Sequence, residues 1–307
     1  MYLIPVVVSI WAGILFGYAS PSPANGSCQA QMTTFPLDPG SKCCSHRPGT
    51  KILRDINNVA HIDEHPWAAL LDYDLKKGSS KSLCSGTLIS SRYVLTAAHC
   101  ITGIVQEIGK LTHVRLGDHD YNHEGPDCVS VAGGGEDCTD GAIRIETEKI
   151  IPHPEYDSTK KINDIGLIRL NEAAPYTDFI RPICLPTKNV ETSPPDHSLY
   201  AISWFKDNIK KVFEVPFVEQ KKCQTIYSKR GRNVTLGKGQ VCAGGLEGKD
   251  PCKGDGGGAL VYEKKEDLAE LTGIVSFGPS LCGQKDLPSI YTNVFEYLDW
   301  IKSNIVA

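Results

Sequence analysis

The sequence lacks several features that define other classes of protein. It has no closely spaced CxxC-type pair, which argues against a zinc site built from its cysteines. It has no excess of positive charge, since the formal net charge is −4 at pH 7, so we expect no nucleic-acid partner. It has no internal repeat, no low-complexity block and no second long apolar run after residue 19, so we expect no membrane partner.

One apolar run is present, in residues 1–19 (MYLIPVVVSIWAGILFGYA), which carry no charged side chain. Ser20-Pro21-Ser22-Pro23 ends this run, and small residues at Gly17 and Ala19 or at Ser22 and Ala24 offer cleavage sites. The run therefore predicts a signal peptide over 1–19 rather than a membrane anchor, and a secreted chain.

All cysteines lie beyond the predicted signal peptide, and their number is even. An even number in a secreted chain predicts disulfides in an extracellular protein. The 12 cysteines are Cys28, Cys43, Cys44, Cys84, Cys100, Cys128, Cys138, Cys184, Cys223, Cys242, Cys252 and Cys282.

The composition and the hydrophobic pattern of the chain change near Pro66. Residues 20–51 are rich in Ser, Pro, Gly and Cys and show no helical or strand period. From Pro66 onward, short apolar runs alternate with turn residues, which predicts an all-β domain of barrels or a sandwich. Near the end, Val294, Leu298 and Ile301 recur at helical spacing and predict a C-terminal amphipathic helix.

Two stretches carry charge of mostly one sign. Residues 118–140 hold seven acids and no Lys or Arg, and residues 206–232 hold eight Lys/Arg against three acids. Charge runs of this kind are typical of solvated faces. Asn233-Val234-Thr235 and Asn25-Gly26-Ser27 are glycosylation sequons, of which the first is the better candidate because it lies in a polar loop.

Three motifs resemble the catalytic blocks of chymotrypsin-like serine proteases, in that family's order. They are LTAAHC at 95–100, NDIGLIRL at 163–170 and CKGDGGGALV at 252–261. Supporting blocks are CSGTLIS at 84–90, RPICLP at 181–186, VCAGG at 241–245, GIVSFG at 273–278 and IYTNV at 290–294. The resemblance covers residues 52–307 and implies an all-β, two-barrel chymotrypsin-like fold with a C-terminal helix.

The resemblance assigns His99 as the general base and Asp164 as the residue that orients it. The backbone N–H groups of Gly254 and Gly256 would form the oxyanion hole. Gly256 stands where the family has its nucleophilic serine, and no neighbouring residue supplies a hydroxyl or thiol. Loss of that nucleophile costs about 10⁶-fold in kcat in a comparable triad, so we expect no working protease.

Further departures from the family agree with this expectation. Asp250 matches the aspartate at the base of the pocket that selects Lys or Arg, and Gly278 belongs to the same pocket remnant. Ser289 stands where those enzymes keep glycine, so we expect a narrowed pocket. Ser203-Trp204-Phe205 replaces the usual Gly-Trp-Gly.

The activation segment is also altered. Active members are cut before an Ile-Val-Gly-Gly-like sequence, and the new amino group pairs with the aspartate before the serine, here Asp255. Cuts after Lys51 or Arg54 are both possible, but no Gly-Gly follows either position. Asp255 would then need another partner, or would lie in a solvated, zymogen-like site.

The family pattern also implies the disulfides. The pairs are Cys84–Cys100, Cys223–Cys242 and Cys252–Cys282, with an extra pair, Cys128–Cys138, that resembles arthropod clip-domain proteases. Cys184 would form a disulfide with Cys43 or Cys44, and Cys28 would form one with whichever of those two remains. Residues 20–51 are identified as a degenerate clip-like segment, because a clip domain has six cysteines and only three are present.

As a whole, the chain resembles the non-catalytic clip-domain serine protease homologues of arthropods. This group includes prophenoloxidase-activating cofactors and serine protease homologues of parasitoid wasp venom. The resemblance implies secretion into haemolymph or venom, and clip proteases, prophenoloxidase or its cofactors as partners. The favoured function is that of an inhibitor of the melanisation cascade, acting as a decoy for a clip protease or its cofactor. Two alternatives stay open, namely an activating cofactor and a pattern-recognition or adhesion protein. No cofactor is expected, except that Asp118 and Asp120 are weak calcium candidates.

Overall fold

The computed structural model describes residues 28, 32–41, 43–45, 58–130, 134–196, 199–204, 208–232, 234–264, 268–279 and 281–307. Several predictions lie outside these residues: the signal peptide, the possible cuts after Lys51 and Arg54, Phe205, and both sequon asparagines, Asn25 and Asn233. Within the described residues, no helix is long and apolar enough to cross a membrane.

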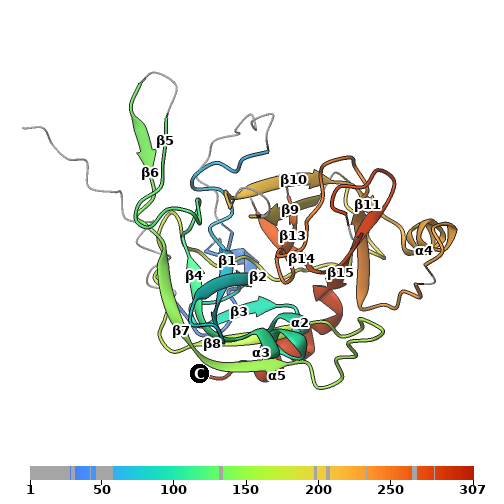
Figure 1. Cartoon of the computed structure of the whole chain (residues 1–307), viewed down its shortest axis with the longest axis horizontal. Helices are drawn as coiled ribbons and strands as arrows, with labels where there is room; N and C mark the ends of the chain where they lie inside the picture. The colour runs from blue at the N-terminus through green and yellow to red at the C-terminus, as the bar shows by residue number, and fades with distance from the viewer. Residues whose placement is uncertain are drawn as a thin grey trace, which may run out of the picture.

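The first half of the described chain forms a closed antiparallel barrel (Figure 1). Closure pairs every strand on both sides and removes exposed sheet edges. Leu71, Val94, Val114 and Leu167 are fully buried in its core. The barrel order is β1 (Ala68–Leu75), β2 (Ser80–Leu88), β3 (Tyr93–Thr96), β8 (Gly166–Leu170), β7 (Ile143–Pro152) and β4 (Gly109–Leu116).

The second half forms a barrel-like sheet of seven antiparallel strands, with Leu199, Val215, Leu260 and Tyr291 buried together. The predicted fold is therefore confirmed, with two barrel-like sheets in a mostly β chain. The order is β10 (Lys211–Val215), β9 (Leu199–Ser203), β13 (Ala259–Glu263), β14 (Ala269–Phe277), β15 (Pro288–Asn293), β12 (Gln240–Gly244) and β11 (Phe217–Val218).

The helices in the described residues are few and short. The predicted C-terminal helix is present as a 3₁₀ turn, η2 (Val294–Tyr297), followed by α5 (Leu298–Asn304). Val294 and Ile301 are fully buried and Leu298 packs against the core, as their spacing predicted. The others are η1 (Pro39–Ser41), α2 (Ala98–Ile101), α3 (Ile104–Ile108) and α4 (Gln220–Lys229).

Six disulfides use all the cysteines. Cys184 binds Cys44, and Cys28 binds Cys43, which decides between the two alternatives for the amino-terminal segment. The other four pairs are those implied by the family pattern: Cys84–Cys100, Cys128–Cys138, Cys223–Cys242 and Cys252–Cys282. The Cys44–Cys184 bond ties the segment ahead of the first barrel to the connection between the two sheets.

Candidate functional site

The His–Asp pair assigned from sequence is assembled between the two sheets. His99 lies in α2, directly after β3, and Asp164 lies just before β8. His99 Nδ1 is 2.8 Å from Asp164 Oδ2, and the His99 backbone N–H donates to Asp164 Oδ1 at 2.9 Å. Asn163, in the left-handed region at φ 53°, turns the chain so that the Asp164 carboxylate faces His99.

The second sheet holds Asp164 in place. Ser276 Oγ donates to Asp164 Oδ2 at 2.6 Å, and Thr292 Oγ1 donates to its carbonyl at 2.7 Å. Burial by itself would raise the pKa of Asp164, but the hydrogen bonds and charge of His99 and the Ser276 hydroxyl together lower that pKa below its ordinary value. Asp164 is therefore a buried carboxylate that orients the His99 ring.

Gly256 sits directly against the other side of the His99 ring. Its carbonyl accepts a hydrogen bond from Ser85 N at 2.8 Å, and its φ is not positive, so the backbone would accept a side chain. A Cβ at this position would overlap His99 Nε2. The imidazole thus occupies space that a side chain of residue 256 would need.

The next glycine is required by the fold. Gly257 has φ 83°, and a Cβ there would overlap Thr96 Oγ1 and the Ser85 carbonyl. The loop before β13 therefore packs its backbone directly onto the first barrel, which keeps Gly256 beside His99.

Asp255 is 1% exposed and is held by several donors, so the alternative of a solvated site for it is wrong. Ser203 Oγ donates to its Oδ2 at 2.6 Å, Trp204 N donates to Oδ1 at 3.1 Å, and Cys252 N donates to Oδ2 at 2.8 Å. Ser203, which departs from the family's Gly-Trp-Gly, thus supplies a hydroxyl to the buried carboxylate.

A cleft of about 700 Å³ runs past His99 and Gly256 and is lined by residues of both sheets. Much of its wall is apolar, and α3 contributes Ile104 and Ile108, which are 77% and 49% exposed. Sequence reasoning did not single out α3, although two isoleucines four residues apart beside a glycine were a visible signal.

The pocket remnant is altered in two ways. Ser289 faces Gly278 across the pocket, since a Cβ on Gly278 would lie 2.8 Å from Ser289 Oγ. Asp250 is only 4% exposed and packs against the end of β12, where Gly245 N donates to its Oδ2 at 3.3 Å. Burial raises the pKa of Asp250 to about 7, although the Gly245 hydrogen bond lowers it. Asp250 is therefore a buried group whose protonated form is favoured by burial.

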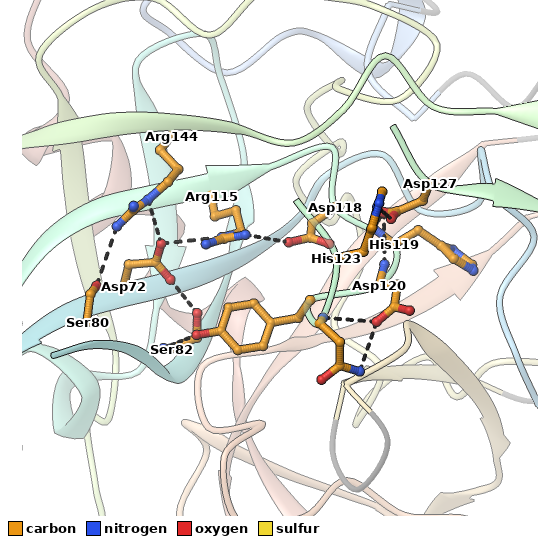
Figure 2. A network of polar contacts seen from close by, with 12 residues as sticks. Asp72, Ser80, Ser82, Arg115, Asp118, His119, Asp120, His123, Asp127 and Arg144 are labelled. Carbon is orange, nitrogen blue, oxygen red and sulfur yellow. Dashed lines mark hydrogen bonds and ion pairs between the residues drawn. The ribbon is translucent and has the colours of Figure 1, made fainter. Parts of the chain in front are cut away.

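The acidic stretch 118–140 is only partly a solvated face. Its hairpin, β5 (Cys128–Ser130) and β6 (Glu136–Cys138), projects from the barrel (Figure 1), but Asp118 and Asp127 are buried. Figure 2 shows Arg115 between two carboxylates, with 3.3 Å contacts to Asp72 Oδ2 and Asp118 Oδ2. A buried aspartate is tolerated here because a guanidinium compensates its charge.

The two calcium candidates have protein donors in this network. Asp118 contacts Arg115, and Asp120 Oδ1 accepts hydrogen bonds from the backbone and side-chain nitrogens of Asn122, both at 3.0 Å (Figure 2). In the described part of the chain, neither aspartate belongs to a group of three converging ligand atoms.

The basic stretch 206–232 contains one residue that contradicts its interpretation as a solvated face. Lys210 is 4% exposed, and its burial lowers its pKa to about 8, while the facing carboxylates of Glu64 and Asp118 raise it. Among the described residues of this stretch, the exposed positive charge lies on and after α4, in Lys221, Lys222, Lys229, Arg230 and Arg232.

A closed barrel, a second barrel-like sheet and a His–Asp pair facing a cleft lined by both define the chymotrypsin-like class of protein. The chain belongs to the Trypsin family, whose model matches residues 57–301. It is 45% identical over 297 residues to "Phenoloxidase-activating enzyme" of Bombyx mori, covering 91% of this chain and 66% of that protein. It is 44% identical over 264 residues to "CLIP domain-containing serine protease B8" of Anopheles gambiae, covering 80% of this chain and 64% of that protein.

A solved structure is also similar. The Drosophila Grass clip serine protease of the Toll pathway aligns with a TM-score of 0.70 and 32% identity, covering 84% of this chain and 73% of that one. The chain spans less than two thirds of the length of the two curated relatives named above. The similarity to clip-domain serine proteases implied by the sequence motifs is thus confirmed.

Proposed function

We propose that this chain is a secreted, non-catalytic member of the family that regulates a prophenoloxidase or melanisation cascade. The single observation that supports this most directly is the contact between Gly256 and His99. The histidine and Asp164 are arranged as a base and its orienter, but residue 256 carries no atom for the base to deprotonate. The choice of cascade is inferred from the relatives, which are named for phenoloxidase activation and as clip-domain proteases.

The proposed mode of action is that of an antagonist. The protein would bind a clip protease or its cofactor through the surfaces that its active relatives use, without adding proteolysis. The activation segment favours inhibition over activation of the cascade, since Lys51 and Arg54 are followed by no Gly-Gly. Loss of catalysis removes nothing that a competitor needs, whereas loss of activation cleavage would remove the step that an assisting homologue needs.

The site of action is extracellular, either haemolymph or venom. Six disulfides are typical of an oxidising compartment. The Cys44–Cys184 bond would keep the amino-terminal segment attached even after a cut in the connecting stretch.

The test is a melanisation assay with purified components: an activating clip protease, its cofactor and prophenoloxidase. Added protein should lower phenoloxidase activity in a dose-dependent way, with half the effect near its dissociation constant. Acceleration by the intact protein would replace the antagonist with an activating cofactor. No effect, together with binding to microbial surfaces, would favour pattern recognition.

A further inference from the structure

A second cluster of potential ligands lies away from the cleft. Glu64 and His65 precede β1, and Glu263 ends β13 in the second sheet. His65 Nε2 lies 3.4 Å from Glu64 Oε1 and 4.0 Å from Glu263 Oε1, and the three atoms all lie within 4.8 Å of one another. Glu263 is far from Glu64 and His65 in sequence and meets them only because the two sheets pack together.

The His65 ring is buried without a hydrogen-bond partner among the described residues. Its side chain is 0% exposed, and neither Nδ1 nor Nε2 makes a hydrogen bond there. His65 packs edge-on against Trp67, with ring centroids 5.3 Å apart. A buried polar group without a hydrogen-bond partner is unfavourable, so the cluster favours a ligand that binds the ring nitrogen.

The backbone directs the ring to this place. His65 has φ 54°, a left-handed conformation that is uncommon for a residue with a side chain. Glu64 is anchored as well, since its Oε2 accepts a hydrogen bond from His61 N at 3.0 Å while its Oε1 faces His65 Nε2. Such an outer contact holds a carboxylate in one orientation, as metal ligands require.

The spacing fits a small divalent cation. Zinc binds His nitrogen and carboxylate oxygen at about 2.0–2.2 Å in tetrahedral geometry, which separates neighbouring ligand atoms by about 3.3–3.6 Å. His65 Nε2 lies 3.4 and 4.0 Å from the two carboxylates, and the three ligand atoms all lie within 4.8 Å of one another, so the side chains would move inward to bind the ion. We propose that Glu64, His65 and Glu263 form a metal-binding site for a divalent transition-metal ion such as Zn²⁺.

The ion would bind the His65 nitrogen and both carboxylates, adding to the positive charge of Lys210 that already faces Glu64. Glu263, whose side chain is 15% exposed, gives the ion a route from the surface. The other two groups of converging ligand atoms in the described residues contain only disulfide-bonded cysteines as their sulfur donors. Those sulfurs are not available as thiolates. The ion would act structurally, because it would join the segment leading into the first barrel to the second sheet.

The test uses the full-length secreted protein, stripped with a chelator and dialysed. Zn²⁺ is titrated by calorimetry, Co²⁺ by its visible d–d absorption, and Trp fluorescence, to which Trp67 contributes beside Trp204 and Trp300, is followed in parallel. We expect one ion per chain, a tetrahedral cobalt spectrum and a Tm that rises with Zn²⁺ concentration. His65→Phe and Glu263→Gln should each weaken binding at least tenfold.

The matched control is His123→Asn, which removes a histidine whose side chain is 57% exposed and paired with Asp127. It should leave the zinc stoichiometry and affinity unchanged. If His65→Phe fails to fold, Glu263→Gln alone decides. The proposal is overturned if the wild-type protein binds no Zn²⁺, or if His65→Phe or Glu263→Gln binds it as tightly as the wild type does.

Discussion

His99 Nε2 lies so close to Gly256 that a Cβ at residue 256 would overlap it. The ring is held there by Asp164, whose Oδ2 is 2.8 Å from His99 Nδ1. Replacing the missing serine is therefore not a simple restoration, because the His99 ring must first shift away from residue 256. The site keeps the base and its orienter, and a side chain at residue 256 requires the His99 ring to change position.

We accordingly predict that Gly256→Ser restores little activity. The new side chain would displace His99, and Ser289 would still narrow the pocket opposite Gly278. Neither the wild type nor the variant should give a burst with an active-site titrant for Arg or Lys esters, before or after limited proteolysis. Gly256→Ser/Ser289→Gly serves as the comparison, and stoichiometric labelling of the wild-type chain would contradict the non-catalytic proposal.

Ser203→Ala should destabilise the protein by about 1–3 kcal/mol. The substitution removes the hydroxyl that donates to Asp255 Oδ2 at 2.6 Å, in a place where the carboxylate is 1% exposed. Urea unfolding at neutral pH measures the difference. Ser303→Ala, at an exposed position on α5, is the control and should change stability by less than about 0.5 kcal/mol. Equal stability of the two variants would contradict the prediction.

Asp250→Asn should change how stability depends on pH. Burial raises the folded-state pKa of Asp250 from 3.8 to about 7, so between these values the folded state binds more protons than the unfolded state. The stability contribution of this group therefore falls as pH rises through that window. The stability of Asp250→Asn relative to wild type should rise by on the order of 2–4 kcal/mol between about pH 4 and pH 8. Parallel stability curves from denaturant unfolding would show that Asp250 titrates normally.

Cleavage near the amino terminus should leave the protein in one covalent piece. Because Cys44 is bonded to Cys184, a cut after Lys51 or Arg54 cannot release the segment that carries Cys44. Limited proteolysis with trypsin should give one band on non-reducing gels and two on reducing gels. Cys44→Ser/Cys184→Ser, cut in the same way, should show two bands under both conditions. Release of the segment from the wild type without reductant would contradict the pairing.

Charge reversal on α4 should weaken the proposed antagonism. Lys221 and Lys222 are exposed on this helix, so Lys221→Glu/Lys222→Glu should raise the concentration needed for half-inhibition of melanisation severalfold. Lys160→Glu/Lys302→Glu makes the same change of charge at exposed positions elsewhere. The α4 surface is excluded as the partner site if both double variants inhibit as the wild type does.

Much of the site was predictable because its parts lie in short motifs. The blocks around His99, Asp164 and Gly256 each combine a strand end with a turn, so local sequence places the side chain at the edge of a sheet. The two charged stretches were less predictable. A run of like charges usually indicates a solvated face, but Asp118 and Lys210 are buried. Arg115, just before the acidic stretch, pairs with Asp118, and the carboxylates of Glu64 and Asp118 face Lys210.

The sequence by itself determined the all-β class, the order of the catalytic blocks, the glycine at position 256 and the number of disulfides. These features depend on residue identity and on contacts within a short stretch of chain. Only the tertiary structure decided that Cys44 rather than Cys43 binds Cys184, that Ser203 donates to Asp255, and that His65 meets Glu263. The physical reason is that each of these contacts joins residues brought together by the packing of separate elements, and the local pattern of apolar and polar residues carries no information about which partner that packing will supply.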